Sequence, residues 1–82
     1  MRYRVRLTNR FKRSFRKLAR NVQERIEEAV GIIAERPRSG HYIMTMNLWS
    51  YRVGDYRILY HIDDERGEVI LLLVRHRRGV YR

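Results

Sequence analysis

The stretch YRVGDYRILY, residues 51–60, decides the fold. Apolar and polar side chains alternate on both sides of Gly54 and Asp55, a pattern typical of two strands joined by a tight turn. Within this predicted hairpin, Arg52 and Arg57 occupy positions where a half-buried sheet would favour apolar or neutral side chains. An arginine inside a strand usually lies at an edge, is paired with a carboxylate, or is functional.

Two further segments have strand patterns. Residues 2–7, RYRVRL, alternate strictly between arginine and apolar or aromatic side chains, as in a strand with one face in water. Residues 69–74, VILLLV, are apolar at every position, which is typical of a strand covered on both faces by the rest of the protein or by a partner. The polar residues 63–68, DDERGE, are expected to form the turn before it.

Helical spacing indicates two helices between the first strand and the hairpin. Thr8 or Asn9 can cap the first helix, and Asn21 can cap the second. Each helix has an apolar face: Phe11, Phe15 and Leu18 in the first, and Val22, Ile26, Ala29, Val30 and Ile33 in the second. Pro37 ends the helical pattern, so residues 36–47 are expected to form a loop.

The order of strand, two helices and three strands predicts an α+β fold in a single domain, residues 1–82. The simplest arrangement is a three-stranded antiparallel meander with the first strand at its edge and the helical hairpin across one face. The other sheet face is then left open. This face would be a concave basic surface, formed by Arg57 and His61 of one strand and by Arg75, His76, Arg77 and Arg78 of the C-terminal segment.

Charge is the strongest global signal. Nineteen Lys and Arg stand against nine Asp and Glu, a formal net charge of +10, and only two of the nineteen are lysine. The planar guanidinium group binds phosphate oxygens through two parallel hydrogen bonds and stacks on bases. The functional interpretation is a polyanionic partner, either nucleic acid or an acidic protein segment, and the alternative is an arginine-rich solvated surface.

The remaining composition narrows the class of protein. There is no cysteine, so neither disulfides nor thiolate metal sites contribute. The longest apolar run has only six residues, and the N-terminal residues lack the apolar segment of a signal peptide. We therefore expect a soluble, cytoplasmic protein that does not bind a membrane.

The sequence has no metal-ligand spacing, no glycine-rich phosphate loop and no nucleophile elbow, so we expect no metal and no other cofactor. Cleavage of RNA can proceed with a base for the ribose 2′-hydroxyl, cations for the phosphate and an acid for the leaving oxygen.

His76 is the only histidine surrounded by cations, which suits proton transfer, although a solvent-facing histidine is the alternative. Arg57 could instead form a structural ion pair with Asp55 or Glu68. Tyr81 could stack on a base or donate its phenolic proton, or it could fold back onto the sheet.

Two stretches together resemble the RelE/ParE toxin superfamily, and particularly the RelE-type toxins of toxin-antitoxin pairs. They are LWSYRVGDYRILYHIDDE, residues 48–65, and HRRGVYR, residues 76–82. The specific patterns are R-x-G-x-Y-R-x-x-Y-x-x-x-D and H-R-R-x-x-Y, carried here by Arg52, Gly54, Tyr56, Arg57, Tyr60 and Asp64, and by His76, Arg77 and Tyr81.

This resemblance implies an mRNA interferase, a metal-independent endoribonuclease that cuts messenger RNA in the ribosomal A site by attack of the 2′-hydroxyl. Arg57 would stabilise the transition state and Arg77 would assist the leaving oxygen. His76 would be a candidate acid or base, and Tyr81 a base-stacking or proton-donating group. Further RNA-binding residues would be Arg52, Arg75 and Arg78. The resemblance also implies a cognate RelB-like antitoxin with an acidic segment, in a toxin-antitoxin hetero-oligomer.

One departure from the family pattern concerns the general base. Lysines can occupy the strand before the glycine turn in RelE-type toxins, where this sequence has Leu48 and Ser50. If those lysines help to supply the base, this chain must use His76 or another group, or cut weakly. Two alternatives stay open: a ParE-type toxin that inhibits DNA gyrase through protein contacts, and a non-catalytic basic module that binds RNA or the ribosome.

Overall fold

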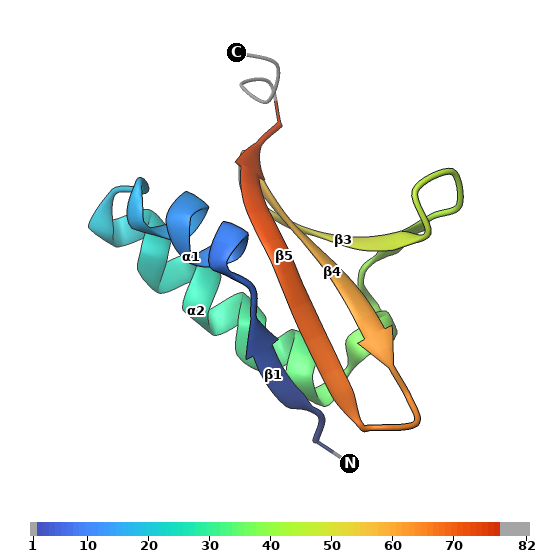
Figure 1. Ribbon diagram of the computed structural model, residues 1–82. Helices are drawn as coiled ribbons and strands as arrows, with labels where there is room; N and C mark the ends of the chain where they lie inside the picture. Colours follow the sequence, from blue (N-terminus) through green and yellow to red (C-terminus); the bar gives the residue numbers. More distant parts are fainter. Residues whose placement is uncertain (1, 78–82) are drawn as a thin grey trace.

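A five-stranded sheet in the order β1-β5-β4-β3-β2 forms the centre of the computed structural model, which describes residues 2–77 (Figure 1). The elements in chain order are β1 (Arg4–Leu7), α1 (Asn9–Arg16), α2 (Arg20–Glu35), the 3-10 helix η1 (Pro37–Ser39), β2 (His41–Ile43), β3 (Leu48–Val53), β4 (Tyr56–Asp63) and β5 (Glu68–His76). Strands β3, β4 and β5 form the predicted antiparallel meander, and β1 pairs in parallel with β5 at its edge. The predicted α+β fold is confirmed.

The hairpin that decides the fold turns at Gly54 and Asp55, as predicted. Gly54 has a φ of +58°, a left-handed conformation that glycine adopts without steric cost. The turn brings β3 and β4 together with Arg52 opposite Arg57. The register therefore places both of these arginines on one face of the sheet.

Thr8 fixes the start of α1. Its Oγ1 accepts a hydrogen bond from the Phe11 backbone N–H at 3.1 Å and donates one to the Leu71 carbonyl at 2.9 Å, so the cap also joins the helix to β5. Helix α2 starts at Arg20, and Ala19 before it makes no side-chain capping bond. The prediction of Asn21 as a cap is wrong, because that residue lies within the first helical turn.

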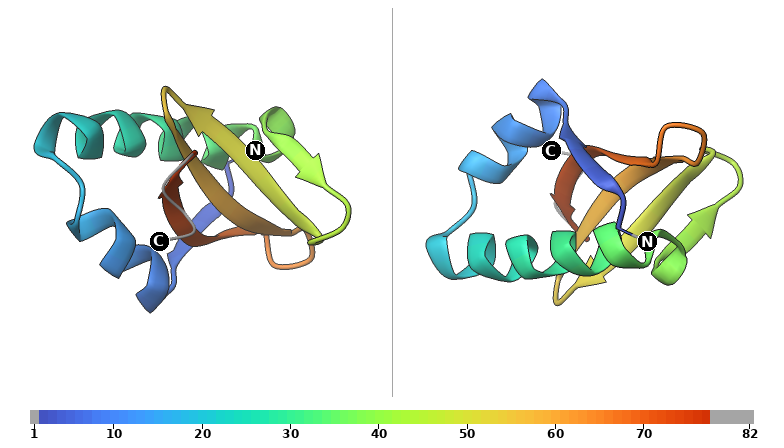
Figure 2. Two further views of the ribbon diagram at one scale, coloured as in Figure 1. Left: turned by 90° about the horizontal axis from the view of Figure 1, so that it is seen from above. Right: turned by 90° about the horizontal axis from the view of Figure 1, so that it is seen from below.

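Both helices pack on the same face of the sheet, as the two views of Figure 2 show. The fully buried core alternates along β4 and β5 and meets the apolar faces of the helices. Its members are Phe11, Ile26, Ala29, Ile33, Val53, Ile58, Tyr60, Val69, Leu71 and Val74. On the opposite face no helix packs among residues 2–77, and we call it the open face.

The expected loop at residues 36–47 contains two short elements, η1 and β2. Strand β2 adds a fifth strand by pairing with β3, with Tyr42 opposite Trp49 and their ring centroids 5.3 Å apart. A strand of three residues is too short to give a periodic pattern, so only this cross-strand packing reveals it.

A β-bulge interrupts the pairing of β4 with β5. Leu59 pairs with Leu73 but Tyr60 pairs with Leu71, so Leu72 is an extra residue in β5. Because the extra residue reverses the alternation, Leu71 faces the helices whereas Leu73 and Arg75 lie on the open face. The bulge thus decides which side of the sheet Arg75 occupies.

Candidate functional site

Three arginines form a row across the open face. Arg52 on β3 is the pairing partner of Arg57 on β4, which is in turn the partner of Arg75 on β5. Cβ atoms of directly opposed residues lie about 4.5–5.5 Å apart in an antiparallel sheet, and like charges at such positions are destabilising. This arginine row is therefore electrostatically costly until an anion joins it.

None of the three arginines in the row is neutralised by a carboxylate among residues 2–77. The two carboxylates considered as partners for Arg57 pair elsewhere: Asp55 with Arg77, and Glu68 with the arginines of β1. The structural ion pair proposed as the alternative role of Arg57 is thus not formed.

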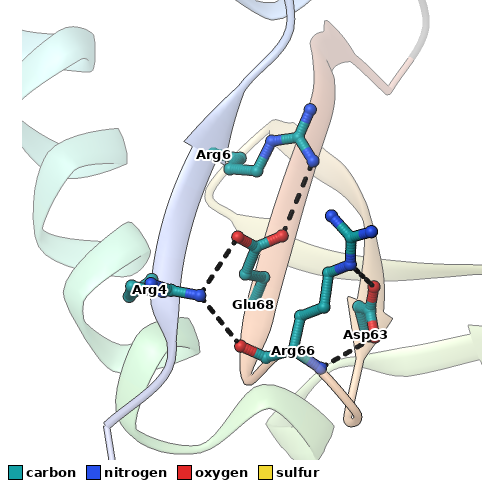
Figure 3. Close-up of polar contacts among 5 residues, drawn as sticks. All are labelled: Arg4, Arg6, Asp63, Arg66 and Glu68. Atoms are coloured by element: carbon teal, nitrogen blue, oxygen red, sulfur yellow. Dashed lines mark hydrogen bonds and ion pairs between the residues drawn. The ribbon is translucent and has the colours of Figure 1, made fainter.

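Figure 3 shows the ion pairs that Glu68 forms with two arginines of β1. Its carboxylate lies between Arg4 and Arg6, with a nitrogen of each 3.5 Å from one of its two oxygens. The Glu68 side chain is only 12% exposed, while both arginines are mostly exposed. One carboxylate therefore pairs with two cations at the β1 edge, whereas the three cations of the arginine row have no carboxylate paired with them among residues 2–77.

A pocket of about 220 Å³ lies beside the row. Its lining consists of His41, Ile43, Ser50, Arg52 and Arg57. It is smaller than the roughly 300–1,000 Å³ of pockets that enclose a drug-sized ligand. It therefore suits one group of an extended polymer, such as a phosphodiester with its ribose, better than a whole small molecule.

The row has an apolar neighbour on the same face. Leu59 is 1% exposed and is the pairing partner of both Ser50 and Leu73. A charge close to buried apolar atoms is less screened by water, so the guanidinium groups act more strongly on a bound anion than they would on a fully solvated surface.

The structure does not bring His76 to the arginine row. His76 is opposite Tyr56, and their rings meet edge to face with centroids 5.1 Å apart. Strand alternation puts this pair on the helix side of the sheet, whereas Arg57 and Arg75 lie on the open face. Of the described histidines, the one that lines the pocket is His41.

Arg77 follows the last residue of β5 and is tied to the hairpin turn. Its backbone N–H donates to the Asp55 carbonyl at 2.8 Å, and its Nε lies 3.7 Å from Asp55 Oδ1. Both side chains are largely exposed, so this ion pair is weak and can open. Two other predicted site residues, Arg78 and Tyr81, lie outside the described residues.

His41 and Ser50 line the pocket, although the sequence patterns did not indicate either of them as a site residue. They are paired residues of β2 and β3, and Ser50 is 7% exposed. The position of Ser50, on the predicted strand before the glycine turn, was a signal in the sequence for this part of the site. His41 gave no such signal, because it lies in the segment that was expected to be a loop.

A second polar cluster, centred on Asp64, lies at the other end of β4. Asp64 accepts two hydrogen bonds from Arg38, at 2.6 and 3.2 Å, and one from the Tyr3 hydroxyl at 2.6 Å. These bonds, first that of Arg38 and then that of Tyr3, hold the pKa of Asp64 below its usual value. The cluster joins the N-terminal segment, η1 and the turn between β4 and β5, so its role is structural.

A larger cavity lies on the helix side, and its lining is mostly apolar, with Lys12, Arg16 and Glu27 also taking part. It has a volume of about 550 Å³ and lies between the helices and β1, lined mainly by Val5, Leu7, Phe11, Phe15, Ile26 and Val30. Leu7 is 47% exposed there. We call it the apolar groove.

Within residues 2–77, no three His, Asp or Glu side chains gather in a way that could hold a metal ion. The polar side chains that line the pocket beside the arginine row offer guanidinium, imidazole and hydroxyl groups. In the same part of the chain, neither helix is long and apolar enough to cross a membrane.

Comparison with known proteins identifies the fold as that of the small toxins of toxin-antitoxin pairs. The chain belongs to the RelE/ParE superfamily, because residues 5–81 match the family described as the ParE toxin of the type II toxin-antitoxin system, parDE. The protein is therefore the toxin of a type II toxin-antitoxin system. The resemblance found in the sequence is confirmed.

Individual relatives support this membership. Toxin RelG of Mycobacterium tuberculosis is 37% identical over 86 residues, covering 100% of this chain and 99% of that protein. The toxin-antitoxin complex RelBE2 of the same organism contains a chain with a TM-score of 0.85 and 35% identity, over 93% of this chain and 99% of that one. The intact RelBE complex of E. coli gives a TM-score of 0.81 at 23% identity, over 90% and 95% of the two chains, and shows the same fold.

Proposed function

We propose that this toxin is a metal-independent endoribonuclease that cleaves messenger RNA in the ribosomal A site. The observation that carries the proposal is the arginine row of Arg52, Arg57 and Arg75, which no carboxylate neutralises within the described residues. Cations held in place on neighbouring strands match the need of phosphodiester cleavage, where negative charge develops on the phosphate oxygens. Similarity to Toxin RelG supports a role as a toxin.

Arg57 has the central role because it lies between the other two arginines of the row. We assign it the stabilisation of the transition state, with Arg75 and Arg52 holding the phosphate from the two sides. Arg77, whose pair with Asp55 is exposed, can turn from that carboxylate toward the leaving oxygen.

The shape of the site favours RNA that is presented by another molecule. The pocket beside the row is small and belongs to an open sheet face, so it offers few contacts that would distort a free RNA strand. Orientation of the 2′-hydroxyl toward the phosphate contributes strongly to the rate of such reactions. A ribosome that already holds the message would supply this orientation.

The partner of this toxin is a RelB-like antitoxin with an acidic segment, in a hetero-oligomer. The relatives in the RelBE2 and RelBE structures are bound to their antitoxins. Here the acidic segment would neutralise the arginine row, and apolar side chains would cover the apolar groove. An affinity that is indifferent to salt and to reversal of the arginine charges would contradict this proposal.

Induction of the toxin in cells, followed by primer-extension mapping of messages, tests the proposed function. We expect cuts within translated regions in phase with codons. Uncut messages in arrested cells would contradict the nuclease.

A rival function is inhibition of DNA gyrase, which the ParE description of the matching family favours. It would leave messages intact while gyrase stalls on DNA. A passive basic RNA-binding module is the third possibility, and growth arrest on induction would count against it.

A further inference from the structure

The pocket beside the arginine row contains an imidazole that has no assigned role. His41 and Ser50 are paired residues of β2 and β3, and they line the pocket together with Arg52 and Arg57. The pocket thus places an imidazole, whose neutral ring has a nitrogen that accepts a proton, within the same small volume as two arginines. No residue of the proposed mechanism so far accepts a proton.

The other two histidines lie elsewhere. His76 packs against Tyr56 on the helix side of the sheet. His61 pairs with Ile70 farther along β4 and is not part of the pocket lining. All three histidines of the chain are within the described residues, so His41 is the one that shares a pocket with Arg57.

The backbone before His41 is held close to the sheet. A Cβ atom at Gly40 would lie 2.6 Å from the Tyr60 hydroxyl oxygen and 2.7 Å from the Ser50 carbonyl oxygen, so only glycine fits here without a shift. Tyr42 packs on Trp49 on the other side of β2. These contacts place His41 on the open face although β2 has only three residues.

We propose that His41 accepts the proton of the attacking ribose 2′-hydroxyl, an inference that rests on the proposed endoribonuclease function. It would take the place of the lysines that the resemblance led us to expect at Leu48 and Ser50.

Neutral His41 takes the 2′-hydroxyl proton on a ring nitrogen while the 2′-oxygen forms a bond to phosphorus. The bond from phosphorus to the 5′-oxygen breaks, and that oxygen leaves as a hydroxyl with a proton from water. The products are a 2′,3′-cyclic phosphate and a 5′-hydroxyl, and the imidazolium returns its proton to water.

The charged groups that face His41 are consistent with this role. Arg52 from β3 and Arg57 from β4 are cations, and no carboxylate lines the pocket. Strand β2 pairs with β3, so Arg52 is the cation of the adjacent strand, and Arg57 lies one strand farther on. The pocket therefore contains a base and two cations, without an anion that would repel a phosphate.

The test is cleavage of a defined message on stalled ribosomes by purified toxin, under single-turnover conditions from pH 5.5 to pH 9. The variants are His41→Ala, the near-isosteric His41→Gln, and His61→Gln as a matched histidine control on the same face. For wild type we expect a rate that rises from acidic pH and then levels off. Both His41 variants should lose about 10²–10⁴-fold in rate and should lack the acidic limb of the profile.

Two further readouts separate proton transfer from a structural role. Added imidazole should restore part of the rate of His41→Ala, and ribosome binding by that variant should be unchanged. His61→Gln should keep both the rate and the profile of wild type.

A His41→Gln variant that cuts with the wild-type rate and profile would overturn the inference and leave the nuclease intact. Loss of rate with an unchanged pH profile and no rescue by imidazole would overturn it as well. If the wild-type toxin did not cut the message, both the proposed function and the role of His41 would be wrong.

Discussion

Arg57 on β4 and Arg75 on β5 are directly opposed residues on the open face of the sheet, and no carboxylate pairs with either among residues 2–77. Two guanidinium groups in this position repel each other, so the arrangement lowers the stability of the unliganded fold. A phosphate placed between them turns repulsion into two attractive contacts. The arrangement is thus suited to binding an anion and poorly suited to stabilising the sheet.

Replacing Arg57 should lower the rate of cleavage without lowering the stability of the fold. We expect Arg57→Ala to lose about 2–4 kcal/mol of transition-state stabilisation while its melting temperature stays the same or rises, because a repulsive contact is removed. Cleavage on ribosomes and thermal denaturation measure the two effects. Arg66→Ala, an exposed arginine in the turn between β4 and β5, is the matched control and should cut normally. Full toxicity of Arg57→Ala would refute the assigned role.

Arg77 and Asp55 allow a comparison of two substitutions that break the same ion pair. If Arg77 assists the leaving oxygen, Arg77→Ala should lower cleavage, whereas Asp55→Ala should retain it. Either change should cost less than about 1 kcal/mol of stability, because both side chains are largely exposed. Equal loss of cleavage in the two variants would mean that Arg77 acts through the turn and not on the RNA.

The hydroxyl of Tyr60 links η1 to the core through a hydrogen bond. It donates a hydrogen bond to the Pro37 carbonyl at 2.6 Å, its side chain is fully buried, and burial raises the pKa of Tyr60 to about 12. Tyr60→Phe leaves that carbonyl without a partner, so we expect a loss of about 1–3 kcal/mol in urea unfolding. Tyr42→Phe removes an exposed hydroxyl and should change stability by less than about 0.5 kcal/mol. Equal stability of the two variants would show that the Pro37 bond contributes nothing.

Asp64 should make stability depend on acid pH. Its pKa is held below the ordinary value of 3.8 by Arg38 and then by Tyr3, so the unfolded chain binds its proton more readily than the folded one. The stabilisation is complete above the ordinary value and is lost as the pH falls through the lower folded pKa. The urea midpoint measured from pH 7 to pH 3 should therefore fall less steeply for Asp64→Asn than for wild type.

Glu65→Gln removes a neighbouring exposed carboxylate that forms no ion pair within the described residues. Its acid profile should follow that of wild type. If Glu65→Gln reduced the pH dependence of the urea midpoint as much as Asp64→Asn does, the effect would come from net charge and not from the bonds of Asp64 to Arg38 and Tyr3.

Secondary structure could be predicted from the sequence wherever a repeating pattern of apolar residues extends over several residues. The alternation on both sides of Gly54 and the helical spacing of Phe11 and Phe15 each reflect burial of one face, so the hairpin and the helices could be predicted. Strand β2 could not, because its three residues are held by contacts with β3 that no local pattern records.

The candidate site was harder to predict because one residue reverses the alternation. Without the extra residue Leu72, Arg75 would share a face with Leu71 and would point toward the helices. The arginine row therefore depends on a bulge inside an uninterrupted apolar run. His41 was missed for a related reason, since its place on the open face follows from β2, which the sequence does not reveal.

The parallel pairing of β1 with β5 joins the two ends of the chain. Arg4 and Glu68 are neighbours in space although they are 64 residues apart in the chain, and Arg75 follows only at the end of β5. Contacts of such long range form late, after the intervening chain has been made. A nascent chain that ends before β5 has neither the closed sheet nor the complete arginine row, so the ribosome that synthesises the toxin is not exposed to its finished surface during elongation.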